Sequence, residues 1–110
     1  MEKKESEKDI ERYLRRQCKR HGWLCLKMRP FENGYPDRIV FLPHGLTAWV
    51  ELKSTGCKPR KLQFKRMDSL IEMGHIVAWA DSRSIIDYLV SDLEEMCKGR
   101  ETGESMDSVS

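Results

Sequence analysis

The chain has 110 residues, enough for one compact domain with one hydrophobic core. Apolar residues make up 39% and charged residues 35%, a balance that is typical of soluble globular proteins and excludes a disordered chain. No apolar run approaches the about 20 residues of a membrane span, and the N-terminus lacks the apolar segment of a signal peptide, so we expect a cytoplasmic protein. The four cysteines have no zinc-site spacing and are expected to be reduced thiols.

The first half of the chain predicts one helix followed by strands. After a charged lead-in over residues 1–5, Ser6 has the character of a helix N-cap, and Gly22 is a natural stop for that helix. Runs rich in β-forming residues follow, separated by a loop that contains Pro30 and Gly34 and by the turn Pro43-His44-Gly45. The strands are predicted at residues 23–28, 38–42 and 46–52.

The second half alternates helix, strand and helix. A helix should begin near Pro59 or Arg60 and end near residue 73. A further apolar β-run follows at residues 76–80. Asp81 or Ser82 can cap the last helix. The order α-β-β-β-α-β-α predicts an α/β fold with a mixed β-sheet flanked by helices. We expect the domain to span residues 6–97 and residues 98–110 to form a disordered tail.

The residues that carry chemistry gather in the predicted hairpin. Glu51 and Lys53 are two residues apart in one strand, so their side chains share a face of the sheet. If the turn is centred on His44, the numbers of cross-strand partners sum to 88 and Asp37 lies opposite Glu51. A shift of half a residue in the turn centre would place Asp37 opposite Leu52 instead. The register therefore decides whether the two carboxylates meet.

Two facing carboxylates repel each other by roughly 3 kcal/mol at about 5 Å and an effective dielectric constant near 20. Lys53 compensates part of that repulsion, and a divalent cation compensates more, since carboxylate oxygens suit Mg²⁺ or Mn²⁺. A bound cation lowers the pKa of its water and stabilises negative charge on a phosphoryl oxygen. The pattern thus indicates a phosphodiesterase centre, with a surface salt-bridge cluster as the alternative interpretation.

The first helix can add a carboxylate. Its inward stripe passes through Ile10 and Leu14, and Glu7 lies at the edge of that stripe. Glu11 lies further round, toward solvent, so Glu7 is the better candidate and Glu11 the fallback. On helix geometry alone, the plainer interpretation of either is an exposed acid in an i,i+4 pair.

The second helix begins inside a basic run. Residues 58–66 hold five basic residues and no acid, although the net charge of the chain is only +2. Gln63 lies within this run and, with its basic neighbours, is placed to meet phosphates beside the backbone N–H groups of the helix start. A solvated helix face with an ordinary polar residue is the alternative. The candidate DNA-binding residues are Lys58, Arg60, Lys61 and Lys65.

Three motifs together resemble the virus-type replication–repair nuclease (VRR-NUC) domain of the PD-(D/E)xK nuclease superfamily. They are Gly34-Tyr35-Pro36-Asp37, Val50-Glu51-Leu52-Lys53 and Lys58-Pro59-Arg60-Lys61-Leu62-Gln63, and the similarity runs over about residues 6–93. The resemblance implies a restriction-endonuclease-like fold and a Mg²⁺ or Mn²⁺ site. It also implies roles: Asp37, Glu51, the Leu52 carbonyl and Glu7 (or Glu11) as metal ligands, Lys53 as the catalytic lysine, and Gln63 completing the set.

The chain looks like a stand-alone phage or bacterial member of that family. Such members are similar to Holliday-junction resolvases, which implies a homodimer that cuts branched DNA in DNA repair, inside an infected or bacterial cell. Symmetric cutting of two strands also calls for two copies of a one-site domain. Two alternatives stay open: a nicking or restriction-type nuclease on duplex DNA, and a non-catalytic DNA-binding module that keeps the nuclease fold.

Overall fold

The computed structural model of the chain describes residues 3–29 and 32–101. Its elements follow the predicted order, with a single-turn 3-10 helix, η1, inside the hairpin. The helices and strands are α1 (Glu7–Arg20), β1 (Leu24–Lys27), β2 (Arg38–Phe41), η1 (Pro43–Gly45), β3 (Thr47–Leu52), α2 (Lys61–Glu72), β4 (Ile76–Ala80) and α3 (Arg83–Glu101). The predicted α/β fold class is confirmed.

The four strands form one mixed sheet in the order β1-β2-β3-β4. β1 and β2 pair antiparallel, as do β2 and β3, whereas β3 and β4 are parallel because α2 forms the crossover between them. In the β2–β3 hairpin, Arg38 pairs with Val50 and Ile39 with Trp49. The partner numbers sum to 88, so the register predicted from a turn centred on His44 is confirmed.

Side-chain caps fix where the helices begin. The Ser6 hydroxyl accepts a hydrogen bond from the Asp9 amide at 3.1 Å and starts α1, as the sequence predicts. The Gln63 side-chain oxygen accepts one from the Arg60 amide at 2.8 Å and holds the start of α2. Ser82 caps α3 by accepting a hydrogen bond from the Ile85 amide at 3.2 Å.

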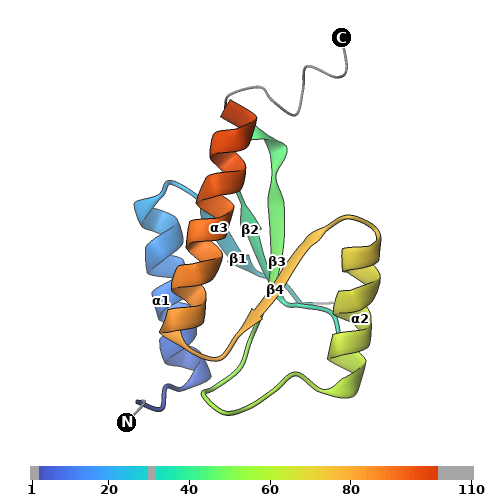
Figure 1. The fold of residues 1–110 in the computed structure, drawn as a ribbon. Helices are drawn as coiled ribbons and strands as arrows, with labels where there is room; N and C mark the ends of the chain where they lie inside the picture. The colour runs from blue at the N-terminus through green and yellow to red at the C-terminus, as the bar shows by residue number, and fades with distance from the viewer. Residues whose placement is uncertain (1–2, 30–31, 102–110) are drawn as a thin grey trace.

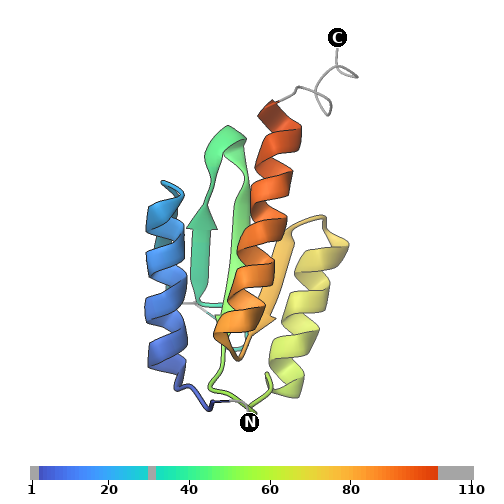
Figure 2. The ribbon, with the colours of Figure 1, turned by 60° about the vertical axis from the view of Figure 1, so that its left-hand side comes forward.

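The two faces of the sheet are covered differently. α1 and α3 lie on one side of the sheet and α2 on the other (Figure 1), and α1 and α3 pack against each other across their shared side (Figure 2). We call the side under α1 and α3 the closed face. Its strand residues are buried in the main hydrophobic core together with apolar residues of both helices. These strand residues are Val40, Ala48, Val50, Leu52 and Ala80.

We call the opposite side the open face, because α2 packs mainly on β4 and leaves β1 and β2 uncovered within the described residues. Side chains alternate along a strand, so Leu24, Leu26 and Phe41 turn to this face, as do Trp49 and Glu51. Glu51, the candidate catalytic residue within β3, therefore lies on the side of the sheet that the helices cover least.

The C-terminal end of the domain differs from the prediction. α3 continues to Glu101, so residues 98–101 are helical and not part of a tail; Lys98 and Arg100 in its last turn suit the negative end of the helix dipole. The rest of the expected tail lies outside the described residues. At the other end, Glu5 is anchored: its carboxylate lies 2.7 Å from the Arg83 guanidinium, and its backbone exchanges hydrogen bonds with Thr55. Within the described ranges, no helix is both long and apolar enough to cross a membrane.

Candidate active site

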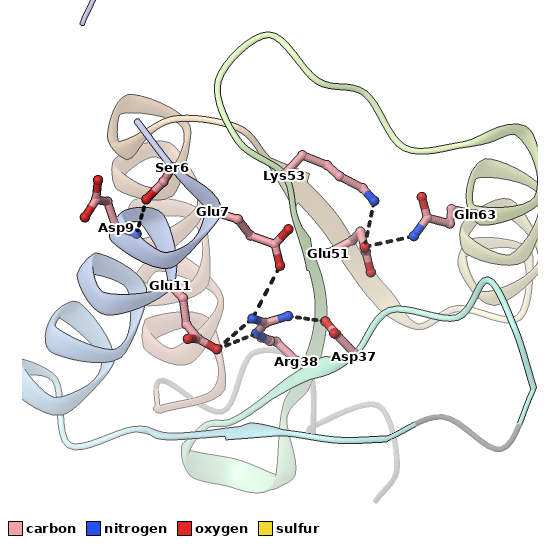
Figure 3. Close-up of polar contacts among 9 residues, drawn as sticks. All are labelled: Ser6, Glu7, Asp9, Glu11, Asp37, Arg38, Glu51, Lys53 and Gln63. Atoms are coloured by element: carbon pink, nitrogen blue, oxygen red, sulfur yellow. Dashed lines mark hydrogen bonds and ion pairs between the residues drawn. The ribbon is translucent and has the colours of Figure 1, made fainter. Parts of the chain in front are cut away.

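The hairpin brings Asp37 and Glu51 together at the end of the sheet. Continuing the β2–β3 register by one residue beyond Arg38 and Val50 places Asp37 opposite Glu51, and Figure 3 shows their carboxyl groups near each other. The connection that sets this register is tight: His44 adopts a left-handed conformation with φ of 64°.

Glu51 is a buried carboxylate held by two neighbours. The Gln63 side-chain amide donates a hydrogen bond to its Oε2 at 2.9 Å, and the Lys53 ammonium lies 3.4 Å from the same oxygen. Gln63 reaches Glu51 from the first turn of α2, while its own oxygen caps that helix. Gln63 therefore connects the start of α2 to the strand that carries Glu51. The sequence predicted Gln63 as a site residue but not this double contact.

The surroundings of Glu51 disfavour its ionised form. Burial raises the pKa of Glu51 above its ordinary value of 4.5, and the negative charges of Asp37 and Glu7 raise it further, although Lys53 pulls it down. The net direction of the pKa shift is upward, so Lys53 does not offset burial and the neighbouring negative charges together. An additional cation at this position would stabilise the ionised form of Glu51.

Arg38 organises the remaining carboxylates. Its side chain is almost completely buried, and its guanidinium donates two hydrogen bonds to Glu11 Oε2, at 2.6 and 3.0 Å, and one to Asp37 Oδ1. Glu7 lies 3.7 Å from the same guanidinium. The arginine thus connects α1 to the head of β2 (Figure 3). The sequence prediction gave Arg38 no role, because its partners on α1 are about 30 residues away along the chain.

The two helix-one glutamates do not lie as the helical wheel predicted. Glu11 was expected to turn toward solvent, but its side chain is 22% exposed whereas that of Glu7 is 49% exposed. The reason is Arg38, which donates two hydrogen bonds to Glu11. Burial raises the pKa of Glu11, but the hydrogen bonds and charge of Arg38 outweigh burial, so the pKa is lowered. The charge of Glu7 nonetheless contributes to the raised pKa of Glu51. Glu11 is thus held by arginine, and Glu7 faces the Glu51 side.

Comparisons with known proteins bear on this arrangement. No protein-family model matches the chain. A curated protein named "Putative nuclease p44", from Acyrthosiphon pisum secondary endosymbiont phage 1, is 34% identical over 84 residues, which cover 76% of this chain and 90% of that protein. A solved structure described as "VRR_NUC domain" matches with a TM-score of 0.72 over 79% of this chain and 97% of that one, at 24% identity, and so shares its fold.

The chain belongs to the family of this phage protein, which is named a nuclease, and it has the fold of a VRR-NUC domain.

The basic residues predicted to meet DNA lie around the start of α2. All four are exposed, two of them just before α2 and two on α2 itself: Lys58, Arg60, Lys61 and Lys65. The Arg60 amide bonds Gln63, which in turn bonds Glu51, so the basic segment is continuous with the site. Leu52, whose carbonyl was a candidate ligand, lies between Glu51 and Lys53 at the end of β3.

Among the described residues, no three His, Cys, Asp or Glu side chains converge into a complete metal-binding group. The donor chemistry nevertheless fits a hard divalent cation. Carboxylate oxygens are its preferred ligands, and Mg²⁺ commonly binds through one or two carboxylates while water and substrate phosphates fill its other positions. The facing pair of Asp37 and Glu51 is a partial donor set of that kind.

Proposed function

We propose that this VRR-NUC chain is a Mg²⁺- or Mn²⁺-dependent DNA endonuclease. The observation that carries the proposal is Glu51: a buried carboxylate, opposite Asp37, with a raised pKa and an ammonium group 3.4 Å away. Such a carboxylate is costly to keep ionised in a fold that needs it only for packing. Its presence is explained if a cation and a phosphate occupy the same place during the reaction. The 34% identical phage protein, which is named a nuclease, supports the same activity.

Asp37 and Glu51 would hold the cation, with Glu7 reaching it from α1 and the Leu52 carbonyl beside it. Lys53 and Gln63 both contact Glu51 Oε2, and we assign the other oxygen, Oε1, to the cation. Glu11 is engaged by Arg38 and serves the site indirectly, by keeping that guanidinium in place. When bound, the cation would supply Lewis acidity toward a phosphoryl oxygen and lower the pKa of a coordinated water.

The residues of the chain then perform three tasks. Lys53 stabilises the negative charge that develops as water attacks the phosphorus and the P–O bond to the leaving oxygen breaks. Gln63 keeps the Glu51 carboxylate oriented through its 2.9 Å hydrogen bond. The exposed basic side chains around the start of α2 hold the DNA backbone, namely Lys58, Arg60, Lys61 and Lys65.

The substrate that we propose is branched DNA, including the four-way Holliday junction, cut by a homodimer acting in DNA repair within the cytoplasm of a bacterial or phage-infected cell. A single copy of the domain carries a single Glu51-x-Lys53 site, and cutting two strands symmetrically requires two such sites. A four-way junction is itself close to two-fold symmetric, which a two-fold symmetric dimer matches.

The test is cleavage by Glu51→Ala and Lys53→Ala on branched and linear DNAs with Mg²⁺ or Mn²⁺. We expect each variant to lose at least about 100-fold in cleavage rate, since removal of one preorganised charged group commonly costs that much. Binding to DNA in Ca²⁺ should change little. Glu95→Ala, an exposed glutamate on α3, is the matched control and should cut normally. Normal cleavage by folded Glu51→Ala or Lys53→Ala would refute the proposal.

The same assay separates the alternatives. A nicking or restriction-type nuclease would cut linear duplex as fast as a four-way junction of equal length. A non-catalytic binding module would cut neither DNA, and calorimetric titration with Mn²⁺ would then show no binding that depends on Asp37 and Glu51.

A further inference from the structure

The outer side of α1 carries a row of positive charges. Four basic residues recur at intervals of four, three and four residues, a spacing that places them along one side of the helix, away from its buried stripe: Lys8, Arg12, Arg15 and Lys19. All four side chains are exposed, and we call this row the α1 basic stripe. Asp9 lies 3.6 Å from Arg12, and within the described residues no carboxylate lies within 4.0 Å of the other three. The stripe is therefore largely available to an external anion.

The two neighbouring helices of the closed face differ sharply in charge. α1 has six basic and three acidic residues, whereas α3, which packs beside it, has three basic and five acidic residues. Their net formal charges are +3 and −2, respectively. A polyanion that approaches this side of the molecule is thus attracted to α1 and repelled by α3.

The α1 basic stripe borders the candidate active site. Arg15 follows Glu11 by four residues and lies about 40° round the helix axis from it, and Glu11 bonds Arg38 at the head of β2. Lys27, exposed and paired with Arg38 in the sheet register, adds a positive charge where β1 packs on α1. Figure 3 shows α1 on one side of Glu51 and the start of α2 on the other. The site therefore lies between the α1 basic stripe and the basic segment around the start of α2.

The length of the stripe suits a nucleic-acid backbone. Lys19 follows Lys8 by eleven residues, which corresponds to about 17 Å of helix at a rise of about 1.5 Å per residue. Over that distance one strand of B-DNA carries about five phosphates, because it has one per about 3.4 Å of helix axis. Four long cationic side chains on one helix can thus contact phosphates along a strand without reading its bases.

Other anionic partners fit the stripe less well. A helix that binds a membrane surface inserts its apolar side into the bilayer, but that side of α1 consists of Ile10, Leu14 and Cys18, which are at most 1% exposed. An acidic protein carries charge on only some of its residues, whereas DNA carries one at every nucleotide. A continuous row of cations therefore favours DNA.

We infer that the α1 basic stripe binds the phosphate backbone of the substrate DNA, so that the DNA is held on both sides of Asp37 and Glu51. The inference rests on the proposed function, which makes DNA the substrate, and adds a second contact surface outside the segment around the start of α2. DNA held on one side only can pivot about its contacts. Contacts on both sides restrict that motion and keep the phosphate to be cut next to Lys53.

The experiment measures binding of the full chain to a fluorescently labelled four-way junction by anisotropy, in Ca²⁺ and between about 50 and 200 mM salt. The test variant combines Arg15→Gln with Lys19→Gln, which removes two positive charges from exposed positions. We expect its affinity at about 100 mM salt to fall at least about tenfold. The slope of log affinity against log salt should become shallower by about 1.8, because each phosphate contact contributes about 0.9.

The matched control is Lys98→Glu on α3, which changes the net charge by the same two units. Lys98 is exposed and lies 3.8 Å from Glu95, so the control should bind the junction within about threefold of wild type. A second control combines Arg15→Lys with Lys19→Arg. It keeps both charges and should bind within about twofold of wild type, because a phosphate accepts hydrogen bonds from either cation.

A measurement on the wild-type chain decides if the test variant does not fold. An amine-reactive acetylating reagent labels exposed lysines, and mass spectrometry reports the extent at each one. Bound junction DNA should slow the labelling of Lys8 and Lys19 but not that of Lys98.

Four results would overturn the inference. The first is a wild-type chain that binds no junction DNA. The second is a folded test variant with wild-type affinity and salt slope, or labelling of Lys8 and Lys19 that DNA does not slow. The third is an equal loss of affinity in the test variant and in Lys98→Glu, which would mean that only net charge matters. The fourth is unchanged DNA binding with weaker binding to poly-glutamate or to anionic vesicles, which would assign the stripe to an acidic protein or a membrane.

Failure of this inference can be told apart from failure of the proposed function. Binding in Ca²⁺ does not depend on cleavage, so a chain that binds DNA through the α1 basic stripe and cuts none would refute the proposed function and leave this inference standing. Cleavage that needs Glu51 and Lys53, together with normal binding by the test variant, would refute this inference alone.

Discussion

The two faces of the sheet have different roles, although the same strands form both. The closed face packs Val40, Val50 and Leu52 against α1 and α3, and these residues are at most 1% exposed. The open face holds Glu51, with its raised pKa, and leaves Leu24 and Phe41 about half exposed. Because successive residues of a strand point to opposite faces, residues of β3 alternate between stabilising the fold and forming the candidate site.

The unfavourable carboxylate pair lies on the open face, and the apolar core that stabilises the fold lies on the closed face. Apolar burial on the closed face supplies folding free energy, and a like-charged pair on the open face consumes part of it. Arg38 is the one polar residue buried in the β2 row of the closed face within the described chain, and it lies at the end of the sheet where both sides meet. Its contacts with Glu11 and Asp37 link the stabilising side to the candidate site.

The largest effect on stability is expected from Arg38→Met. It leaves Glu11 and Asp37 as half-buried carboxylates without their partner, and breaking a buried ion pair in this way costs about 3–5 kcal/mol. Urea denaturation measures the free energy of unfolding. Arg12→Met, at an exposed pair on the same α1, is the control and should cost less than about 1 kcal/mol.

The loss of stability caused by Arg38→Met should also depend on pH. Arg38 lowers the pKa of folded Glu11, so Glu11 contributes stability above its ordinary pKa of 4.5 and loses it as the pH falls through the lowered folded value. Arg38→Met lacks that contribution at every pH. The gap between wild type and Arg38→Met should therefore narrow on acidification, and a constant gap would contradict the ion-pair explanation.

A matched pair of leucines compares the two sides directly. Leu14 of α1 is fully buried in the main core, and Leu14→Ala should destabilise the chain by about 3 kcal/mol through lost burial and a cavity. Leu62 of α2 is 42% exposed, and Leu62→Ala should cost about 1 kcal/mol or less, partly because Ala favours helix. Equal losses in urea denaturation would show that the open side is packed as firmly as the closed side.

The smallest expected change in stability is a gain, and it comes from Glu51→Gln. The raised pKa of Glu51 means that the folded state disfavours the ionised group, so its cost is absent below 4.5 and develops as the pH rises from 4.5 to the raised folded pKa. Glu51→Gln keeps an acceptor for Gln63 and removes the charge. We expect a modestly higher melting temperature at pH 7 and no gain in acid, measured by calorimetry without divalent metal. A lower melting temperature at pH 7 would mean that Lys53 already compensates the charge.

The parts of the fold that depend on local signals could be predicted from the sequence. The Ser6 cap, the stop at Gly22 and the strand boundaries follow from nearby residues, and the hairpin register follows from the turn centred on His44. The juxtaposition of Asp37 and Glu51 is a consequence of that register alone.

The parts that depend on long-range contacts could not be predicted in the same way. A helical wheel places Glu11 by its angle on α1, but a buried Arg38 from β2 determines where it points. The extent of α3 depends on packing, since Cys97 is buried near its end. Strand alternation separates two faces but does not say which face the helices cover, so the exposure of Leu24 and Phe41 required the structure.

The β2–β3 hairpin also bears on how the chain reaches its native state. Its strands are joined by only five residues, whereas β4 can pair with β3 only after α2 has formed the crossover. Hairpins close within about 1–10 µs, and contacts between residues distant in sequence form more slowly. We therefore expect Asp37 and Glu51 to meet early in folding, before α2 brings Gln63. The chain would then fold around its carboxylate pair, and under the proposed function a divalent cation present during synthesis would meet its first two ligands in a nascent hairpin.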